Sequence, residues 1–140
     1  MAAELSDLKA IAERALERIP NGSVVGLGTG RAATAFIQLL GERVKNGLSV
    51  RGVPTSRGSA HLATQLGIKL TSFDEIDGID VDVDGADEVD PNLDLIKGYG
   101  RALVREKIVA ASSRRLVILV GDEKLVPRLG TRGKLPVEFR

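Results

Sequence analysis

The chain of 140 residues has no cysteine, a single histidine and only 3% aromatic residues. Without cysteine there is no disulfide framework, no thiol nucleophile and no thiolate metal ligand. One histidine excludes a multi-histidine zinc site, so any metal ion would need oxygen ligands. The scarcity of aromatic residues argues against a base-stacking surface for single-stranded nucleic acid.

The sequence also lacks a charge imbalance and a long apolar run. Lys and Arg number 20 and Asp and Glu 19, which gives no electrostatic reason to expect nucleic acid or an anionic membrane as partner. The longest run of large apolar residues, 116–120, is far too short to span a bilayer. The first residues include acids where a secretion signal has an apolar core, so we expect a cytoplasmic protein by default.

The remaining composition is that of an ordinary globular domain, with 43% hydrophobic and 28% charged residues. Apolar spacing predicts alternating helices and strands, and hence an α/β, Rossmann-like three-layer αβα domain with a mostly parallel sheet. We expect this domain over residues 1–126 and a connector to a further small domain over 127–140. The predicted helices are 5–19 (Ser6 available as a late cap), 32–44, 59–66 and 101–111, and the predicted strands are 24–28, 48–53, 68–73, 79–84 and 116–120.

The stretch VVGLGTGRAA predicts a strand, a glycine loop and a helix. A dinucleotide site would also need an acid at the end of the second strand, and RGVPTS at 51–56 has none, so we expect no NAD(P). A Walker loop is excluded because no Gly-Lys-Ser/Thr follows. Two interpretations remain: a single-phosphate site built from backbone N–H groups and the Thr29 hydroxyl, or a tight turn without a ligand.

The segment IDVDVDGADEVD crowds carboxylates at the end of a predicted strand. Strand alternation puts Asp80, Asp82 and Asp84 on one face. A calcium loop fails because Pro91 stands where its last ligand would be. Crowded carboxylates raise one another's proton affinity, which suits proton handling or hydroxyl binding. For Asp80 and Asp82 the plainer expectation is a solvated charge at the strand edge.

A third predicted loop with functional side chains begins at Lys97. On the helix that follows, a packed stripe is expected from Leu103, Val104, Ile108 and Ala111, with Glu106 pointing away from it. Taken alone, Glu106 reads as a surface acid. The glycine loop, the end of the acidic segment and the turn at Lys97 are expected at one edge of the sheet. Together a carboxylate base, a lysine and a phosphate-binding loop suggest proton transfer next to the carbonyl of a phosphorylated sugar. His61 is expected to be a partly exposed helix residue without a catalytic role.

These motifs resemble the type A ribose-5-phosphate isomerase family. VVGLGTG before a helix, GVPTS, DVDGADEVDPNLDLIKG, ALVREKIVAAS and LPVEF follow the family's order and spacing from about Val24 onward. The resemblance implies interconversion of D-ribose 5-phosphate and D-ribulose 5-phosphate through an enediol, in the pentose phosphate pathway, without metal or cofactor. It implies a homo-oligomer, either dimer or tetramer. It also implies that the sequence stops before the small α+β domain that family members carry.

Matched position by position, the resemblance implies that Glu106 moves the proton between C1 and C2 of the sugar. Asp84 and Asp87, with Lys97, would contact sugar hydroxyls, help open the ring and stabilise the enediolate. The substrate contacts that it implies further are Thr29, Gly30, Arg31, Ala32, Gly85, Ala86, Gly98, Tyr99, Gly100 and Lys124.

Several residues depart from the family pattern. Arg31 and Ala32 replace two hydroxyl residues of the loop, although Arg31 can grip phosphate with two hydrogen bonds. Tyr99 replaces a glycine and is strained if that position has positive φ, and Arg101 stands where a small residue is common. Two alternatives therefore stay open, a non-catalytic sugar-phosphate sensor and a truncated isomerase of low activity. Retention of Glu106 and its partners favours the enzyme.

Overall fold

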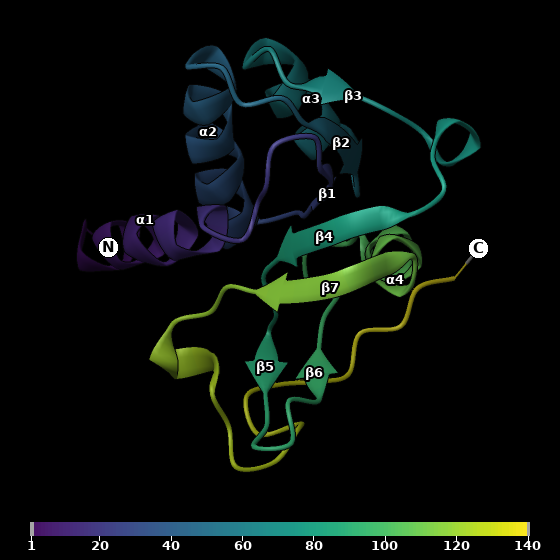
Figure 1. Cartoon of the computed structure of the whole chain (residues 1–140). Coiled ribbons are helices and arrows are strands. Elements are labelled where there is room, and N and C mark those ends of the chain that lie inside the picture. The colour runs from purple at the N-terminus through teal and green to yellow at the C-terminus, as the bar shows by residue number, and fades with distance from the viewer. Residues whose placement is uncertain (1, 140) are drawn as a thin grey trace.

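The computed structural model describes the backbone of residues 2–139 and the side chains of residues 6–139. Within these described residues, four α-helices and seven strands follow one another (Figure 1). The helices are α1 (Ala2–Leu16), α2 (Arg31–Lys45), α3 (Arg57–Gln65) and α4 (Leu103–Ala111), with short 3-10 turns η1 (Phe73–Glu75) and η2 (Asp122–Lys124). The strands are β1 (Val24–Leu27), β2 (Arg51–Pro54), β3 (Lys69–Leu70), β4 (Ile79–Asp84), β5 (Glu88–Val89), β6 (Leu95–Ile96) and β7 (Ser113–Ile118).

Five strands form a parallel sheet in the order β3-β2-β1-β4-β7. Alternate residues of β1 separate its two faces. Val25 and Leu27 pack with residues of α1, α2 and α3, whereas Val24 packs with Val109 of α4. Three helices therefore cover one face and α4 covers the other, which confirms the predicted Rossmann-like α/β architecture.

The strand order places a switch point between β1 and β4. From β1 the chain moves outward to β2 and β3, and it then returns to β4 on the other side of β1. The loops that leave β1 and β4 consequently separate at the carboxyl edge of the sheet, where open α/β folds bind ligands. The glycine loop and the end of the acidic strand lie at this point.

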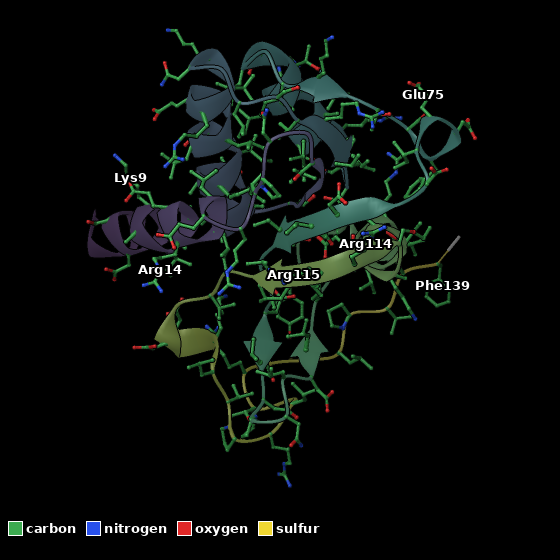
Figure 2. All side chains as sticks on the ribbon, viewed as in Figure 1. Lys9, Arg14, Glu75, Arg114, Arg115 and Phe139 are labelled. Carbon is green, nitrogen blue, oxygen red and sulfur yellow. The ribbon has the colours of Figure 1, made fainter. Side chains whose placement is uncertain are left out.

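Strand β7 forms an edge of the sheet within the described chain. Arg114 and Arg115 are exposed on it (Figure 2), and Leu116 is 38% exposed. None of the described helices is long and apolar enough to cross a membrane.

A small antiparallel hairpin, β5 with β6, lies outside the main sheet and was not predicted. The fully buried Glu88 accepts the backbone N–H groups of Gly130 (2.7 Å) and Arg132 (2.9 Å). Farther along, Glu138 accepts the N–H of Val104 at the start of α4 (3.1 Å). The segment 127–139, without regular secondary structure, is thus hydrogen-bonded to the hairpin and to α4 (Figure 1).

Several predicted boundaries are wrong, for reasons that tertiary pairing explains. Helix α1 already includes Ser6, so Ser6 is not its cap, and it ends at Leu16, before Pro20. Predicted strands 48–53 and 68–73 shrink to Arg51–Pro54 and Lys69–Leu70, the residues that find partners in the sheet. Strand β7 starts at Ser113 rather than 116, because Ser113 pairs with Ile79 of β4.

The last helix also differs from its prediction. Arg101 has φ +68, a left-handed conformation that cannot belong to the helix, so α4 begins at Leu103. The predicted stripe is wrong, because Ile108 is 48% exposed and Ala111 is exposed as well. The buried residues of α4 are Glu106 and Val109 instead, so the helix presents a carboxyl group to the sheet.

Candidate active site

A cleft of about 510 Å³ opens at the carboxyl edge of the sheet, within the usual size range for small-molecule sites. Its walls come from the loops after β1, β4 and β7, from the turn after β6, and from Asp7, Leu8 and Ile11 of α1. The residues of the sequence prediction that line it are Thr29, Gly30, Arg31, Ala32, Gly85, Ala86, Asp87, Lys97, Gly98, Gly100, Glu106 and Lys124. His61 lies outside this lining and is exposed on α3.

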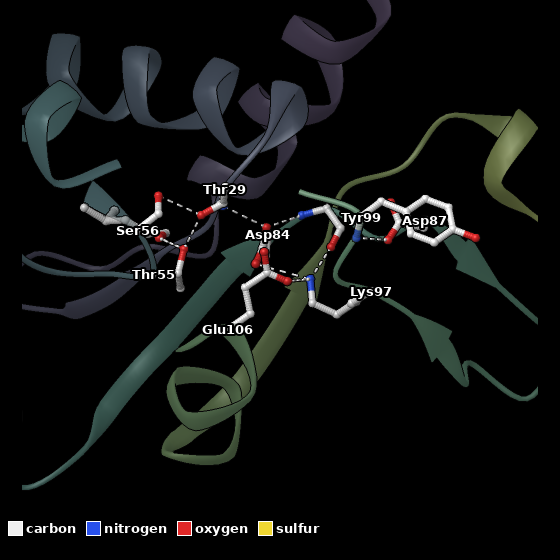
Figure 3. A network of polar contacts seen from close by, with 10 residues as sticks. Thr29, Thr55, Ser56, Asp84, Asp87, Lys97, Tyr99 and Glu106 are labelled. Atoms are coloured by element: carbon white, nitrogen blue, oxygen red, sulfur yellow. Dashed lines mark hydrogen bonds and ion pairs between the residues drawn. The ribbon is translucent and has the colours of Figure 1, made fainter. Parts of the chain in front are cut away.

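The Lys97 ammonium lies at the centre of the site (Figure 3). Its Nζ is 3.2 Å from Asp84 Oδ2 and 3.3 Å from Glu106 Oε1, and it donates a hydrogen bond to the carbonyl oxygen of Gly85. Lys97 directly follows β6, so the unpredicted hairpin is what carries the cation to the sheet edge. Three segments far apart in sequence thereby meet around one positive charge.

Asp84 is held from two sides. Its Oδ1 accepts the N–H groups of Thr29 (3.1 Å) and Gly85 (2.7 Å), while Oδ2 faces Lys97. Burial raises the pKa of Asp84, whereas the charge of Lys97 and the donated hydrogen bonds lower it. Since one carboxylate bonds the loops after β1 and β4 together, Asp84 fixes the geometry of the switch point.

Glu106 is buried, with 4% of its surface exposed, which corrects its reading as a surface acid. Desolvation and, after it, the charge of Asp84 raise the pKa of Glu106, Lys97 opposes both, and the net pKa is about 6. A carboxyl with a pKa near 6 is largely ionised at neutral pH yet basic enough to take a proton from carbon, as a general base must. The contact with Lys97 aims it into the cleft.

Gly26 within β1 and Gly28 just after it make room for carboxyl groups. A Cβ at Gly28 would lie 2.3 Å from Asp84 Oδ1, and one at Gly26 would lie 2.4 Å from Asp82 Oδ1. Gly30 has a different role, because its φ of +106 supplies the turn into α2.

Asp82 contradicts the expectation of a solvated charge. Its side chain is only 1% exposed, and burial, followed by the charge of Asp84, raises its pKa to about 7. Asp80 differs, because it is partly exposed and its Oδ2 accepts the N–H of Val24 (2.8 Å). Strand alternation predicted the shared face correctly, but not that α4 covers it.

Thr55 and Ser56 are site residues that the sequence reasoning missed. The Thr29 hydroxyl lies 2.7 Å from Thr55 Oγ1 and 2.9 Å from Ser56 Oγ, so GVPTS orients the loop after β1 (Figure 3). Ser56 also caps α3 by accepting the N–H of Ser59. The sequence could have indicated them, since these two hydroxyl residues directly follow β2, which ends at the same edge of the sheet as β1.

The Tyr99 ring lies apart from the cleft. Its hydroxyl donates to the carbonyl of Lys134, whereas its backbone N–H donates to Asp87 Oδ2 at 3.1 Å. Tyr99 is not among the cleft-lining residues, and its backbone is not left-handed. The strained residue of this turn is instead Arg101, with φ +68, the second of the two residues that depart from the family pattern here.

Positive charge gathers at the cleft beyond Lys97. Arg31, Lys124 and Arg132 all line it, next to the N-terminus of α2. Arg132 was not singled out from the sequence, and its backbone N–H is fixed by Glu88. Cations beside a helix N-terminus suit a phosphate group. Among the described residues no group of three or more His, Asp or Glu side chains is arranged to hold a metal ion.

Comparison with known proteins gives consistent matches. The family model of ribose 5-phosphate isomerase A (phosphoriboisomerase A) matches residues 51–140. Ribose-5-phosphate isomerase A of Bradyrhizobium diazoefficiens is 57% identical over 127 residues, 91% of this chain and 52% of that relative. The chain spans about half the length of the curated relatives it matches.

Two solved structures match the fold and the sequence together. A D-ribose-5-phosphate isomerase in complex with phospho-erythronic acid is 46% identical with a TM-score of 0.88, over 91% of this chain and 56% of that one. Ribose 5-phosphate isomerase A from Methanocaldococcus jannaschii is 42% identical with a TM-score of 0.87, over 94% of this chain and 58% of that one.

Proposed function

The chain belongs to the ribose 5-phosphate isomerase A family, and from this premise we propose that it interconverts D-ribose 5-phosphate and D-ribulose 5-phosphate. The observation that carries the proposal is the buried contact of 3.3 Å between the Glu106 carboxyl and the Lys97 ammonium, in a cleft with further cations. The phospho-erythronic acid named with one solved relative supports a phosphorylated ligand. A sensor would need the phosphate contacts but not a base aimed at carbon.

Glu106 is the proposed base of the reaction. Its carboxylate takes the proton from C2 of the open-chain aldose, and the electron pair of that C–H bond forms the C1–C2 double bond of the enediol. The oxygen on C1 takes up a proton as the hydroxyl on C2 gives one up, and return of the abstracted proton to C1 then gives the ketose with its carbonyl at C2. A pKa near 6 lets one group do both steps at neutral pH.

Lys97 and Asp84 are the proposed electrostatic partners of this step. As C2 loses its proton, negative charge develops on the oxygen of the former carbonyl, and the ammonium of Lys97, fixed by two carboxyl groups, stabilises it. Asp84 is buried and outside the cleft lining, so it acts through Lys97, which it holds at 3.2 Å, whereas Asp87 lines the cleft and offers acceptors to sugar hydroxyls. The isomerisation moves hydrogen within one molecule, so we propose no redox cofactor and no metal step.

The phosphate is proposed to bind in the same cleft, at the loop that follows β1. Thr29, Gly30, Arg31 and Ala32 form the loop at the N-terminus of α2, and Lys124 lines the same cleft. Backbone N–H groups and cations together supply the donors that a phosphate dianion requires.

Assembly, location and domain limits belong to the same proposal. We propose a homo-oligomer, dimer or tetramer, in the cytoplasm, with the isomerase domain over 1–126 and a connector over 127–140. Exposed apolar side chains support self-association, among them Leu125 at 56% and Phe139 at 91%. The lack of cysteine is compatible with a reducing compartment. Light scattering that gives only a monomer at high concentration would contradict the oligomer.

The test of the function is Glu106→Gln, which keeps size and hydrogen bonding but removes the proton acceptor. In a coupled assay of ribose 5-phosphate isomerisation, kcat should fall about 10²–10⁴-fold with little change in KM. Exchange of the C2 proton with solvent should be lost in parallel. Glu42→Gln, at an exposed site on α2, is the matched control and should keep wild-type rates.

Two outcomes would speak against the proposal. Near wild-type turnover of Glu106→Gln would remove Glu106 from the mechanism, and Asp84 would be the next candidate base. A wild-type chain that binds ribose 5-phosphate without any turnover or proton exchange would favour the sensor.

A further inference from the structure

Asp82 is a buried carboxyl that the proposed reaction does not use. It lies on the same face of β4 as Asp84, it is 1% exposed, and its Oδ1 has no hydrogen-bond partner among the described residues. A buried polar atom without a partner is costly, so its retention calls for a physical reason.

The surrounding structure is shaped around this carboxyl. A Cβ at position 26 would lie 2.4 Å from Asp82 Oδ1 and 2.8 Å from Val109 Cγ1, so only glycine leaves room for the side chain between β1 and α4. Glu106 precedes Val109 by one helical turn and is the other buried residue of α4. Asp82 therefore lies behind Asp84 and beneath the helix that carries the base.

We propose that Asp82 is a positioning residue: its uncharged form, behind Asp84, leaves Lys97 available to the enediolate oxygen, and its ionisation lowers the activity of the centre. This inference rests on the proposed isomerase function. Lys97 already contacts Asp84 and Glu106, so a charge on Asp82 behind them would add a third negative group to this centre and oppose the charge that develops on the substrate.

The groups that face Asp82 support this assignment. Asp84 and Glu106 are negative and raise its pKa, Lys97 lowers it, and burial contributes most, so the pKa of Asp82 rises to about 7. From β1 it meets Gly26, and in the register with β7 its neighbour is Leu116, neither of which titrates. Asp80 shares the face but is engaged with the N–H of Val24.

The test compares Asp82→Asn with Asp80→Asn across pH. Asparagine has the size of the uncharged acid, so at pH 6 Asp82→Asn should keep the wild-type kcat within about threefold. As pH rises through 7, the wild-type kcat should fall about tenfold, corresponding to about one pKa unit of interaction, whereas Asp82→Asn should stay level. The matched control Asp80→Asn should follow the wild type.

A carboxyl titration by 13C NMR gives a readout that needs no turnover. In the wild type, Asp82 and Glu106 should titrate as a coupled pair with two steps, and in Asp82→Asn the Glu106 signal should show a single step. If Asp82→Asn does not fold, the titration of the wild type alone still shows whether Asp82 and Glu106 are coupled. A signal of Asp82 that titrates alone near the ordinary aspartate range would overturn the inference.

The two proposals fail differently. If the wild type lacks isomerase activity while Asp82 and Glu106 still titrate together, the function is wrong and the coupling of the two carboxyls stands. If the wild type is active and Asp82→Asn has the same pH profile and the same Glu106 titration, Asp82 has no such role.

Discussion

Gly28 faces the carboxyl group that holds the centre of the site together. A Cβ there would meet Oδ1 and Cγ of Asp84 at 2.3 and 2.4 Å and its Cα at 2.7 Å, and a backbone atom cannot move aside cheaply. We expect Gly28→Ala to displace Asp84, cost about 1–3 kcal/mol of stability through overpacking, and lower kcat.

The control for this substitution is Gly58→Ala on α3. Its nearest neighbour would be Ser56 Oγ at 3.8 Å, and its φ is not left-handed, so alanine should be neutral or stabilise the helix by about 0.5–1 kcal/mol. Urea unfolding and the coupled assay measure both effects. Equal behaviour of the two variants would show that the space beside Asp84 is not limiting.

Lys97 sets the basicity of Glu106 as well as stabilising the substrate. Burial raises the pKa of Glu106 and Lys97 lowers it, with a net value of about 6, so removal of the ammonium in Lys97→Met should move the titration of Glu106 upward. In the active protein, kcat/KM should fall as the pH drops through about 6, because protonated Glu106 cannot accept a proton. An acid limb that stays below about pH 4.5, the ordinary glutamate range, would contradict this.

The sequence predicts which residues meet in the site, but it does not predict that Asp82 and Glu106 are buried. The order of motifs along alternating strands and helices predicts that Asp84, Lys97 and Glu106 come to one sheet edge, and their side chains do meet there. The burial of Asp82 and Glu106 depends on where α4 packs against β4, which strand alternation and helical spacing do not encode. Charged residues on a predicted helix read as surface residues until that packing is known.

Among the elements, strand β4 was predicted best. It has the predicted bounds, because it is a buried strand with β1 on one side and β7 on the other. The β5–β6 hairpin was missed because each strand has only two residues, too few for a periodic signal. Its turn includes Leu93 with φ +66, a left-handed conformation that is not expected of a leucine, so the sequence gives no signal for this turn.

The hairpin and the segment 127–139 form one unit through Glu88. Its carboxylate is fully buried and accepts two backbone N–H groups of that segment, bonds worth about 1.5–3 kcal/mol each for a charged acceptor. Glu88→Ala should therefore release the segment, and trypsin should cleave faster at Arg128 and Lys134. The exposed Glu75 offers the control Glu75→Ala, which should leave the cleavage rate unchanged. Equal rates for both variants would mean that other contacts hold the segment.

For the whole molecule, the buried carboxyls make stability depend on pH in an unusual direction. Asp82, Asp84 and Glu106 all have raised pKa values. A raised pKa means that the folded state binds more protons than the unfolded state between the two values, so these groups lower stability as pH rises through that range. Most acidic residues in proteins act oppositely, because pairing depresses their pKa.

Asp82 provides the sharpest measurement of this effect. Its pKa rises from 3.8 to about 7, a difference that corresponds to about 4 kcal/mol of lost stability once the pH exceeds the folded value. Asp82→Asn removes the ionisable group, so its thermal midpoint should exceed that of the wild type at pH 8. The difference should shrink as the pH falls and vanish only well below the unfolded pKa of 3.8, where both states of the wild type are protonated. Asp80→Asn should show no such trend, since its carboxylate keeps a hydrogen bond and partial exposure. A midpoint for Asp82→Asn that is lower at every pH would mean that the carboxyl contributes packing or a hydrogen bond that outweighs its charge, and the centre would then be held together by Asp82 rather than strained by it.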